Sequence, residues 1–145
     1  MIIEVSLRFQ NVGSGMQSVV GIDGHTINTL QSDGSAHLIK TFLHDTNSTA
    51  WHALSITLQG KDQSHTILDQ TGAIVSDCAL IVDAICINDI NVSELFLQGQ
   101  QCYIHDQNGQ STTCQDEFYG YMGYNGTVLI EFSTPIHLWF LTRCQ

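Results

Sequence analysis

The strongest constraint in this sequence is an alternation of apolar and polar residues with a period of two. In segment 3–9 every odd residue is apolar and every even residue is polar, and segment 54–58 alternates in the same way between apolar and polar residues. Because successive side chains of a β-strand point to opposite faces, this pattern is typical of strands with one face in a core and the other in water. It predicts an antiparallel β protein.

Further strands are expected where apolar and β-branched residues gather. These segments are 16–22, 36–43, 65–69, 79–87, 92–97, 101–105, 126–132 and 136–141. Segment 79–87 is almost entirely apolar, which indicates a central strand. The only proline, Pro135, is expected to open the last strand, where its missing N–H is tolerated.

Asp-Gly and Asn-Gly pairs separate several of these segments. They occur at 23–24, 33–34, 108–109 and 125–126. Such pairs supply the positive φ that tight hairpin turns require, whereas residues that favour helices are scarce. About ten short strands without long helical windows argue for two packed sheets. We therefore predict an all-β fold, an antiparallel, jelly-roll-like β-sandwich, formed as a single domain by residues 1–145.

The charge balance excludes two classes of partner. The chain has 14 acidic and only 4 basic residues, for a formal net charge of -10. Because binding to nucleic acid or to an anionic membrane requires clustered Lys and Arg, we expect neither. No segment approaches the ~18 apolar residues of a membrane span, and the N-terminal residues lack the pattern of a cleaved signal.

No motif indicates catalysis. The sequence has no phosphate-binding loop, dinucleotide-binding fingerprint, nucleophile elbow or zinc-protease motif. Its 7 histidines are scattered along the chain, and no two of them have the spacing of a helical metal site. We therefore expect a protein that is not an enzyme.

The five cysteines do not form a zinc-binding or redox pattern. Cys78 and Cys86 lie among apolar residues and are expected to be small core side chains. Cys102 and Cys114 flank a polar segment, where a disulfide would staple a hairpin. The odd count leaves at least one thiol unpaired within the chain, and Cys144 is either free or bonded to another molecule.

One acidic segment has the spacing of a calcium-binding loop. Asp106, Asn108 and Glu117 occupy the first, third and twelfth positions of such a loop. Gly109 stands at the fourth position, however, where an EF-hand has its glycine at the sixth. Two interpretations therefore stay open: a polar hairpin tip and a calcium site of another kind.

A few aromatic residues are candidates for sugar binding. A pyranose has an apolar face and a polar rim, so sugar-binding surfaces use exposed aromatic rings with polar neighbours. Trp51 follows a polar run and is expected at an exposed edge, and Tyr103, Tyr121 and Tyr124 are further candidates. The alternative for these residues is packing in a core or an interface, which we expect for Trp139.

Several segments of the chain carry a resemblance to known proteins. They are LSITLQGK (54–61), GAIVSD (72–77), LIVDAICINDI (80–90), YMGYNG (121–126) and FSTPIHLWFL (132–141). Over residues 50–141 the chain resembles small β-sandwich proteins of marine tailed phages. More loosely, it is similar to calcium-dependent carbohydrate-binding modules of the xylan-binding type. The second resemblance implies a jelly roll without catalysis whose sugar site is organised by calcium.

These observations lead to three hypotheses. The first is a non-catalytic structural protein of a virion, either a capsid decoration protein or a module of a fibre or tail appendage. It would assemble in multiple copies with itself or with other virion proteins at the particle surface, with some capacity for surface glycans. The second is a calcium-dependent carbohydrate-binding module. The third is a subunit of an extracellular filament joined by exchange of strand 2–9.

Overall fold

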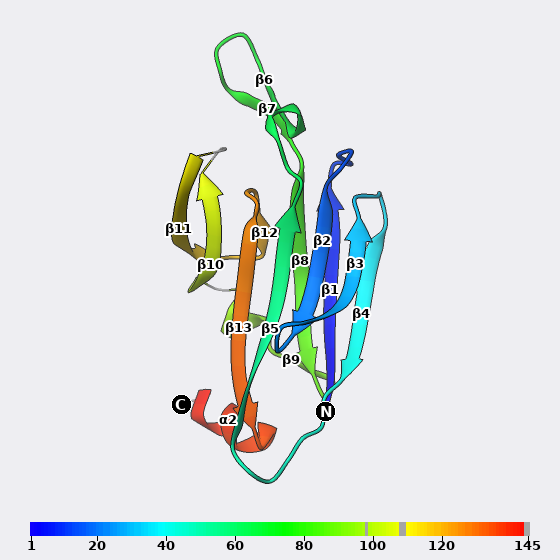
Figure 1. Ribbon diagram of the computed structural model, residues 1–145, viewed down its shortest axis with the longest axis vertical. Coiled ribbons are helices and arrows are strands. Elements are labelled where there is room, and N and C mark those ends of the chain that lie inside the picture. The colour runs from blue at the N-terminus through cyan, green and yellow to red at the C-terminus, as the bar shows by residue number, and fades with distance from the viewer. Residues whose placement is uncertain (98, 108–109, 144–145) are drawn as a thin grey trace.

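The chain forms two antiparallel sheets packed against each other (Figure 1). The computed structural model describes residues 1–97, 99–107 and 110–143. The smaller sheet has the strand order β12-β8-β1-β4, and β9 pairs with the far end of β8. Its strands are β1 (Ile2–Gln10), β4 (Ala36–Phe42), β8 (Ala79–Ile87), β9 (Ile90–Asn91) and β12 (Tyr121–Met122).

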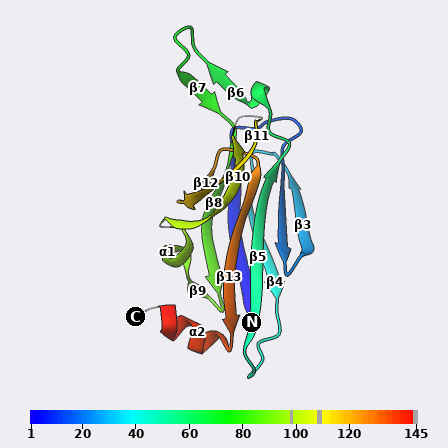
Figure 2. The ribbon, with the colours of Figure 1, turned by 60° about the vertical axis from the view of Figure 1, so that its left-hand side comes forward.

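The larger sheet has six strands in the order β11-β10-β13-β5-β2-β3. They are β2 (Gln17–Ile22), β3 (His25–Gln31), β5 (Ala50–Gln59), β10 (Gln100–Gln107), β11 (Gln110–Phe118) and β13 (Gly126–Thr134). A short helical turn and a hairpin extend beyond one end of the sandwich, as Figure 2 shows. They are η1 (Gln63–His65), β6 (Thr66–Leu68) and β7 (Ile74–Asp77).

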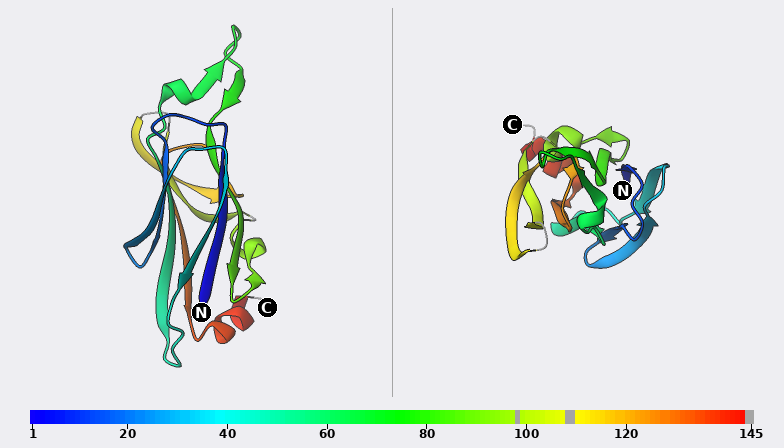
Figure 3. Two further views of the ribbon diagram at one scale, coloured as in Figure 1. Left: turned by 90° about the vertical axis from the view of Figure 1, so that its right-hand side faces the viewer. Right: turned by 90° about the horizontal axis from the view of Figure 1, so that it is seen from above.

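The core lies between the two sheets and is built from the residues that the alternation predicts. One continuous cluster of buried apolar side chains includes members from both sheets. Among them are Ile3, Val5, Leu7 and Phe9 of β1, Leu54, Ile56 and Leu58 of β5, and Val128, Ile130 and Phe132 of β13. The predicted β-sandwich is therefore confirmed. The view from above in Figure 3 shows the strands arranged around this interior.

Two predicted strands are helices. Segment 92–97 contains α1 (Ser93–Phe96), and segment 136–141 lies within α2 (Ile136–Arg143). Pro135 therefore does not open a strand: its carbonyl accepts hydrogen bonds from the backbone N–H groups of Leu138 and Trp139 and so begins the last helix. A short, mostly apolar segment has no clear period, so its sequence alone does not distinguish a helix from a strand. No helix in the described ranges is long and apolar enough to cross a membrane.

Five strands were not predicted, namely β3, β7, β9, β11 and β12. The sequences of β3 and β11 are largely polar, and the other three strands are only two to four residues long. Strands β3 and β11 are the edges of the larger sheet, so polar residues there face water. The predicted Asp23-Gly24 turn places β3 beside β2, with φ values of 52° and 80° at its two residues. That turn prediction is confirmed.

Strand β10 approaches β13 closely at one point and then diverges from it. Only residues 103–105 of β10 pair with β13, whereas β5 pairs with β13 along the whole length of β13. At the point of approach, a Cβ atom added to Gly126 would meet the Ile104 carbonyl oxygen and would lie 2.6 Å from the Cα atom of His105. The absence of a side chain at Gly126 therefore allows the two strands to pair before they separate.

Replacing Gly126 with alanine should therefore destabilise the protein. Backbone atoms of β10 would have to move, and overpacking of this kind costs about 1–3 kcal/mol. Urea unfolding should show this loss in Gly126→Ala. The matched control is Gly34→Ala, where the added Cβ meets nothing within 4 Å. Equal stability of the two variants would contradict the close approach.

Candidate functional site

The outer face of the larger sheet carries a row of side chains that the core does not use. On β13 the outward positions are Leu129, Glu131 and Ser133, which alternate with buried residues. On β5, Trp51 lies directly opposite Ser133 in the ladder and is 64% exposed. Because residues two apart share a face, these four side chains lie on the same surface.

A hollow of about 400 Å³ lies at the Trp51 end of this face, where α2 borders the sheet. Its lining consists of Thr49, Trp51, Ser133, Thr134, Pro135, Leu138, Trp139, Thr142 and Arg143. Trp139 is 4% exposed, and within the described part of the chain its indole Nε1–H has no hydrogen-bond acceptor. We call this space the tryptophan hollow.

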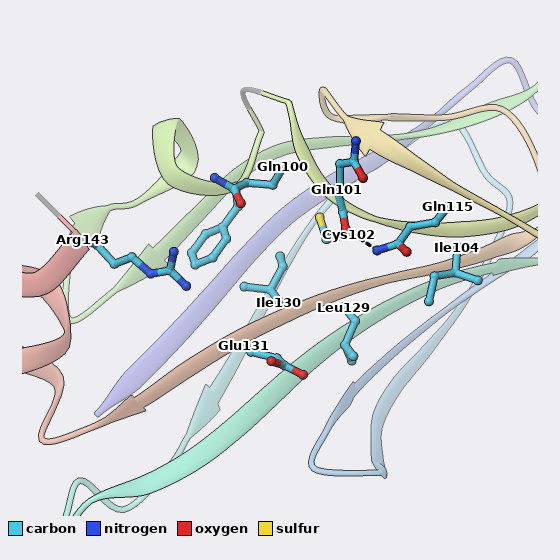
Figure 4. A pocket seen from close by; sticks show the side chains of 10 residues that line it. Gln100, Gln101, Cys102, Ile104, Gln115, Leu129, Ile130, Glu131 and Arg143 are labelled. Carbon is cyan, nitrogen blue, oxygen red and sulfur yellow. Dashed lines mark hydrogen bonds between the residues drawn. The ribbon is translucent and has the colours of Figure 1, made fainter.

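A second hollow, of about 280 Å³, lies where β10 diverges from β13 (Figure 4). Its lining consists of Phe96, Gln100, Gln101, Cys102, Ile104, Gln115, Leu129, Ile130, Glu131 and Arg143. The Gln115 side-chain amide donates a hydrogen bond to the Gln101 carbonyl oxygen at 2.8 Å. We call this space the glutamine hollow, since three amide side chains surround its apolar residues.

Arg143, at the end of α2, lines both hollows. Its guanidinium group lies 5.6 Å from the centre of the Trp139 ring, a distance at which a cation is attracted to an aromatic face. In Figure 4 the side chain extends from the helix toward the glutamine hollow, in which Glu131 also stands. We refer to the two hollows, which have Arg143 in common, as the outer groove.

The three predicted tyrosines lie elsewhere, at the opposite end of β13. Trp51 pairs with the end of β13, whereas Gly126, which begins the strand, shortly follows Tyr121 and Tyr124 in sequence. Tyr103 pairs with Val128, also near the start of β13. The seven steps along the strand from Gly126 to Ser133 correspond to roughly 23 Å. The structure therefore does not bring Trp51 together with Tyr121 or Tyr124.

Tyr103 is a core residue. It is 4% exposed, its hydroxyl donates a 2.6 Å hydrogen bond to the Tyr124 carbonyl oxygen, and it accepts one from the Tyr124 N–H at 3.0 Å. Burial raises the pKa of Tyr103 far above its ordinary value. The Tyr124 ring stacks on His105 at 4.8 Å between centroids. Tyr103 therefore positions a loop, and of the predicted sugar-binding residues it is the one that a ligand cannot reach.

Tyr121 belongs to a polar cluster around Asp77. Lys61 Nζ contacts Asp77 Oδ1 at 2.7 Å, Thr66 Oγ1 donates to the same oxygen at 2.8 Å, and Tyr121 donates to Oδ2 at 3.2 Å. Burial alone would raise the pKa of Asp77, but the hydrogen bonds from Lys61 and Thr66 and the Lys61 charge hold it below its ordinary value. Lys61 also donates to the Gly123 carbonyl oxygen at 2.6 Å, so the cluster ties the loop before β13 to the base of the hairpin.

Part of the acidic segment with the spacing of a calcium-binding loop falls outside the described residues. Asn108 lies outside the described residues. Asp106 lies near the end of β10, and Glu117 lies near the end of β11. Because the two strands are antiparallel and Tyr103 pairs with Asp116, Asp106 and Glu117 are at opposite ends of their ladder. Glu117 accepts a hydrogen bond from the Tyr119 hydroxyl. In the described ranges no three His, Cys, Asp or Glu side chains gather as metal ligands would. The calcium site at Asp106, Asn108 and Glu117 therefore stays a prediction.

The predicted disulfide between Cys102 and Cys114 is not formed, and both are free cysteines. Cys114 lies opposite His105, three positions along β10 from Cys102, which is roughly 10 Å of strand. A disulfide needs Cα atoms within about 7 Å. Cys78 is buried, as predicted, while Cys86 is only half-buried, and Cys144 lies outside the described residues.

Comparison with known proteins identifies no family. No protein-family model and no curated protein matches the chain. Two solved structures have a similar fold. One is the selenomethionine form of vCBM60, reported with two families of calcium-dependent carbohydrate-binding modules that are linked by circular permutation. It is 13% identical in sequence and has a TM-score of 0.53, and the match covers 88% of this chain and 87% of that one. The other is vCBM60 in complex with galactobiose, 16% identical, with a TM-score of 0.49 over 89% and 96%.

The first of these similarities shows a shared β-sandwich fold. That structure is reported with calcium-dependent carbohydrate-binding modules, not with phage or virion proteins. The resemblance to carbohydrate-binding modules is therefore the one that has a structural counterpart, at the level of the fold.

Asp77→Asn should show whether the Asp77 cluster stabilises the fold. At neutral pH the variant should lose about 1–3 kcal/mol, because Lys61 is left buried without its charged partner. The pKa of Asp77 is lowered by folding, so the wild type's advantage is complete at neutral pH and disappears as pH falls through that lowered value, below the ordinary 3.8. Urea unfolding between pH 7 and pH 3 measures the difference.

The control for this experiment is Asp83→Asn, which removes an exposed ion pair with Arg8. Such pairs contribute less than about 1 kcal/mol, so this variant should stay near the wild type throughout. A stability difference for Asp77→Asn that persists unchanged to pH 3 would contradict the role given to its charge.

Proposed function

We propose that this protein is a non-catalytic carbohydrate-binding module and that a glycan lies in the outer groove. The observation that carries the proposal is Trp51, an indole 64% exposed on a regular strand beside a hollow lined by hydroxyl groups. An aromatic face that water reaches, with polar groups around it, is the surface to which the apolar face of a pyranose binds.

The groove offers two kinds of contact. Around the Trp51 ring, Thr49, Ser133 and Thr142 line the tryptophan hollow, and their hydroxyls can both donate to and accept from sugar hydroxyls. In the glutamine hollow, the amide groups and Glu131 extend this polar lining along β13. We propose that one sugar ring stacks on Trp51 and that the glycan chain continues toward the glutamine hollow.

The fold and the topology support this proposal over the alternatives. The sandwich is shared with a structure reported with calcium-dependent carbohydrate-binding modules, so the scaffold suits the role. The filament hypothesis required a free N-terminal strand, but β1 lies inside the smaller sheet, paired with β4 on one side and β8 on the other. Its exchange between molecules would break both ladders. The virion hypothesis gains no support from the site. We treat residues 1–145 as one module because both sheets share one core.

Trp51→Ala should weaken binding to the best glycan ligand about thirtyfold. Loss of a central aromatic contact costs about 2 kcal/mol, and each 1.4 kcal/mol is tenfold in the dissociation constant. A glycan array identifies the ligand, and titration calorimetry measures its affinity for each variant.

The matched control is Phe42→Ala. Phe42 is 70% exposed but belongs to β4 of the other sheet, so its removal should leave the affinity unchanged. Failure of the wild-type protein to bind any glycan, or an equal loss in the two variants, would contradict the proposed function.

Glycan binding in the outer groove should not require calcium. Calcium in proteins takes six to eight oxygen ligands and usually several carboxylates, whereas Glu131 is the only carboxylate that lines either hollow among the residues that the structure describes. We therefore expect the same dissociation constant with added calcium and with an excess of chelator. A tenfold or greater loss on chelation would show that the ligand binds elsewhere or that calcium completes the site.

A further inference from the structure

We propose that the glycan bound in the outer groove carries a carboxylate, as a single uronic acid on an otherwise neutral glycan, and that Arg143 binds that carboxylate. This inference rests on the proposed function and specifies its ligand. It starts from the fact that Arg143 lines both hollows.

Arg143 differs from the other basic residues of the chain. The three others form ion pairs: Arg8 with Asp83 at 3.2 Å, Lys40 with Glu4 at 3.5 Å and Lys61 with Asp77 at 2.7 Å. Within the described residues, Arg143 has no such partner, although acidic residues outnumber basic ones by 14 to 4. In so acidic a protein, a cation without an ion pair in a groove is a site for an anion from outside.

The surroundings of Arg143 favour a planar carboxylate on a sugar ring. A guanidinium group presents paired N–H donors that match the two oxygens of a carboxylate. The Trp139 ring under the guanidinium group helps to hold its orientation. Trp51 and Arg143 line the same hollow, so one sugar ring can stack on the indole while its carboxylate reaches the arginine.

The charge of the whole protein limits how acidic the ligand is. A formal charge of -10 repels a polyanion, and Glu131 lines the glutamine hollow next to Arg143. One carboxylate can be paired with Arg143, but each further one would face an acidic surface without a partner. The groove therefore suits a sparsely charged glycan and disfavours a polyuronate.

The test uses pairs of oligosaccharides that differ only at the carboxylate. Each probe is a glucuronic or galacturonic acid linked to neutral hexoses, and its counterpart has the carboxyl group reduced to an alcohol. Calorimetry on the full chain compares the wild type, Arg143→Gln, Arg143→Lys and Arg8→Gln, the last a control on the other sheet. Thermal unfolding checks that all four are folded.

The wild type should bind the acidic member at least tenfold more tightly than its reduced counterpart. Hydrogen bonds to a charged group of this kind are expected to be worth roughly tenfold to a hundredfold in affinity, and Arg143→Gln should remove that preference. The affinity of Arg143→Gln for the reduced member should stay within about threefold of the wild-type affinity. Arg143→Lys should keep part of the preference for the acidic member, and Arg8→Gln should resemble the wild type.

The outcomes separate the two proposals. If the wild type binds neither member of any pair nor any glycan on an array, the proposed function itself fails. If it binds both members equally, or if Arg143→Gln weakens both equally, the carbohydrate site stands and the role of Arg143 is overturned. Tighter binding of polygalacturonate than of the singly charged probes would overturn the preference for sparse charge.

Discussion

The antiparallel ladder between β5 and β13 is the constraint on which the rest of the structure depends. It runs without interruption from Gly126 opposite Leu58 to Thr134 opposite Ala50. Since side chains alternate along a strand, this one pairing determines both faces of the larger sheet. Its inward residues fill the core, and its outward residues include Trp51 and Glu131 of the outer groove. A shift of one residue in the register would exchange the two sets, so the core holds the groove in place.

Two departures from regular sheet structure turn that outward face into a groove. Strand β10 pairs with the start of β13 at Gly126 and then leaves it, which opens the glutamine hollow. After Pro135 the chain becomes α2 instead of another strand, which encloses the tryptophan hollow and carries Arg143 to its rim. If a further strand replaced α2 after Pro135, the outward face of the larger sheet would be flat and would offer a ligand no concave site.

The alternation of apolar and polar residues predicted the fold and the buried faces of β1 and β5, because a strand that is buried on one side has an apolar residue at every second position. The exposure of Trp51 and the burial of Trp139 were also predicted, from a polar run and an apolar run. The outer groove could not be predicted, because it depends on where β10 diverges from β13 and on α2. The apolar residues of α2 have no clear period and so do not indicate a helix. The sequence does not single out Arg143, since only the structure shows that Arg8, Lys40 and Lys61 have acidic partners.

The central claim is that the ligand-binding surface of this protein is the outward face of β5 and β13 beside α2. A map of NMR chemical shifts during titration with a glycan that binds tests this most directly, since it reports every amide and both indole N–H groups at once. The account predicts the largest changes at the Trp51 indole and in residues 129–134 and 138–143. Changes confined to the other end of the sandwich, around Tyr121 and Tyr124, with the Trp51 indole unchanged, would contradict it.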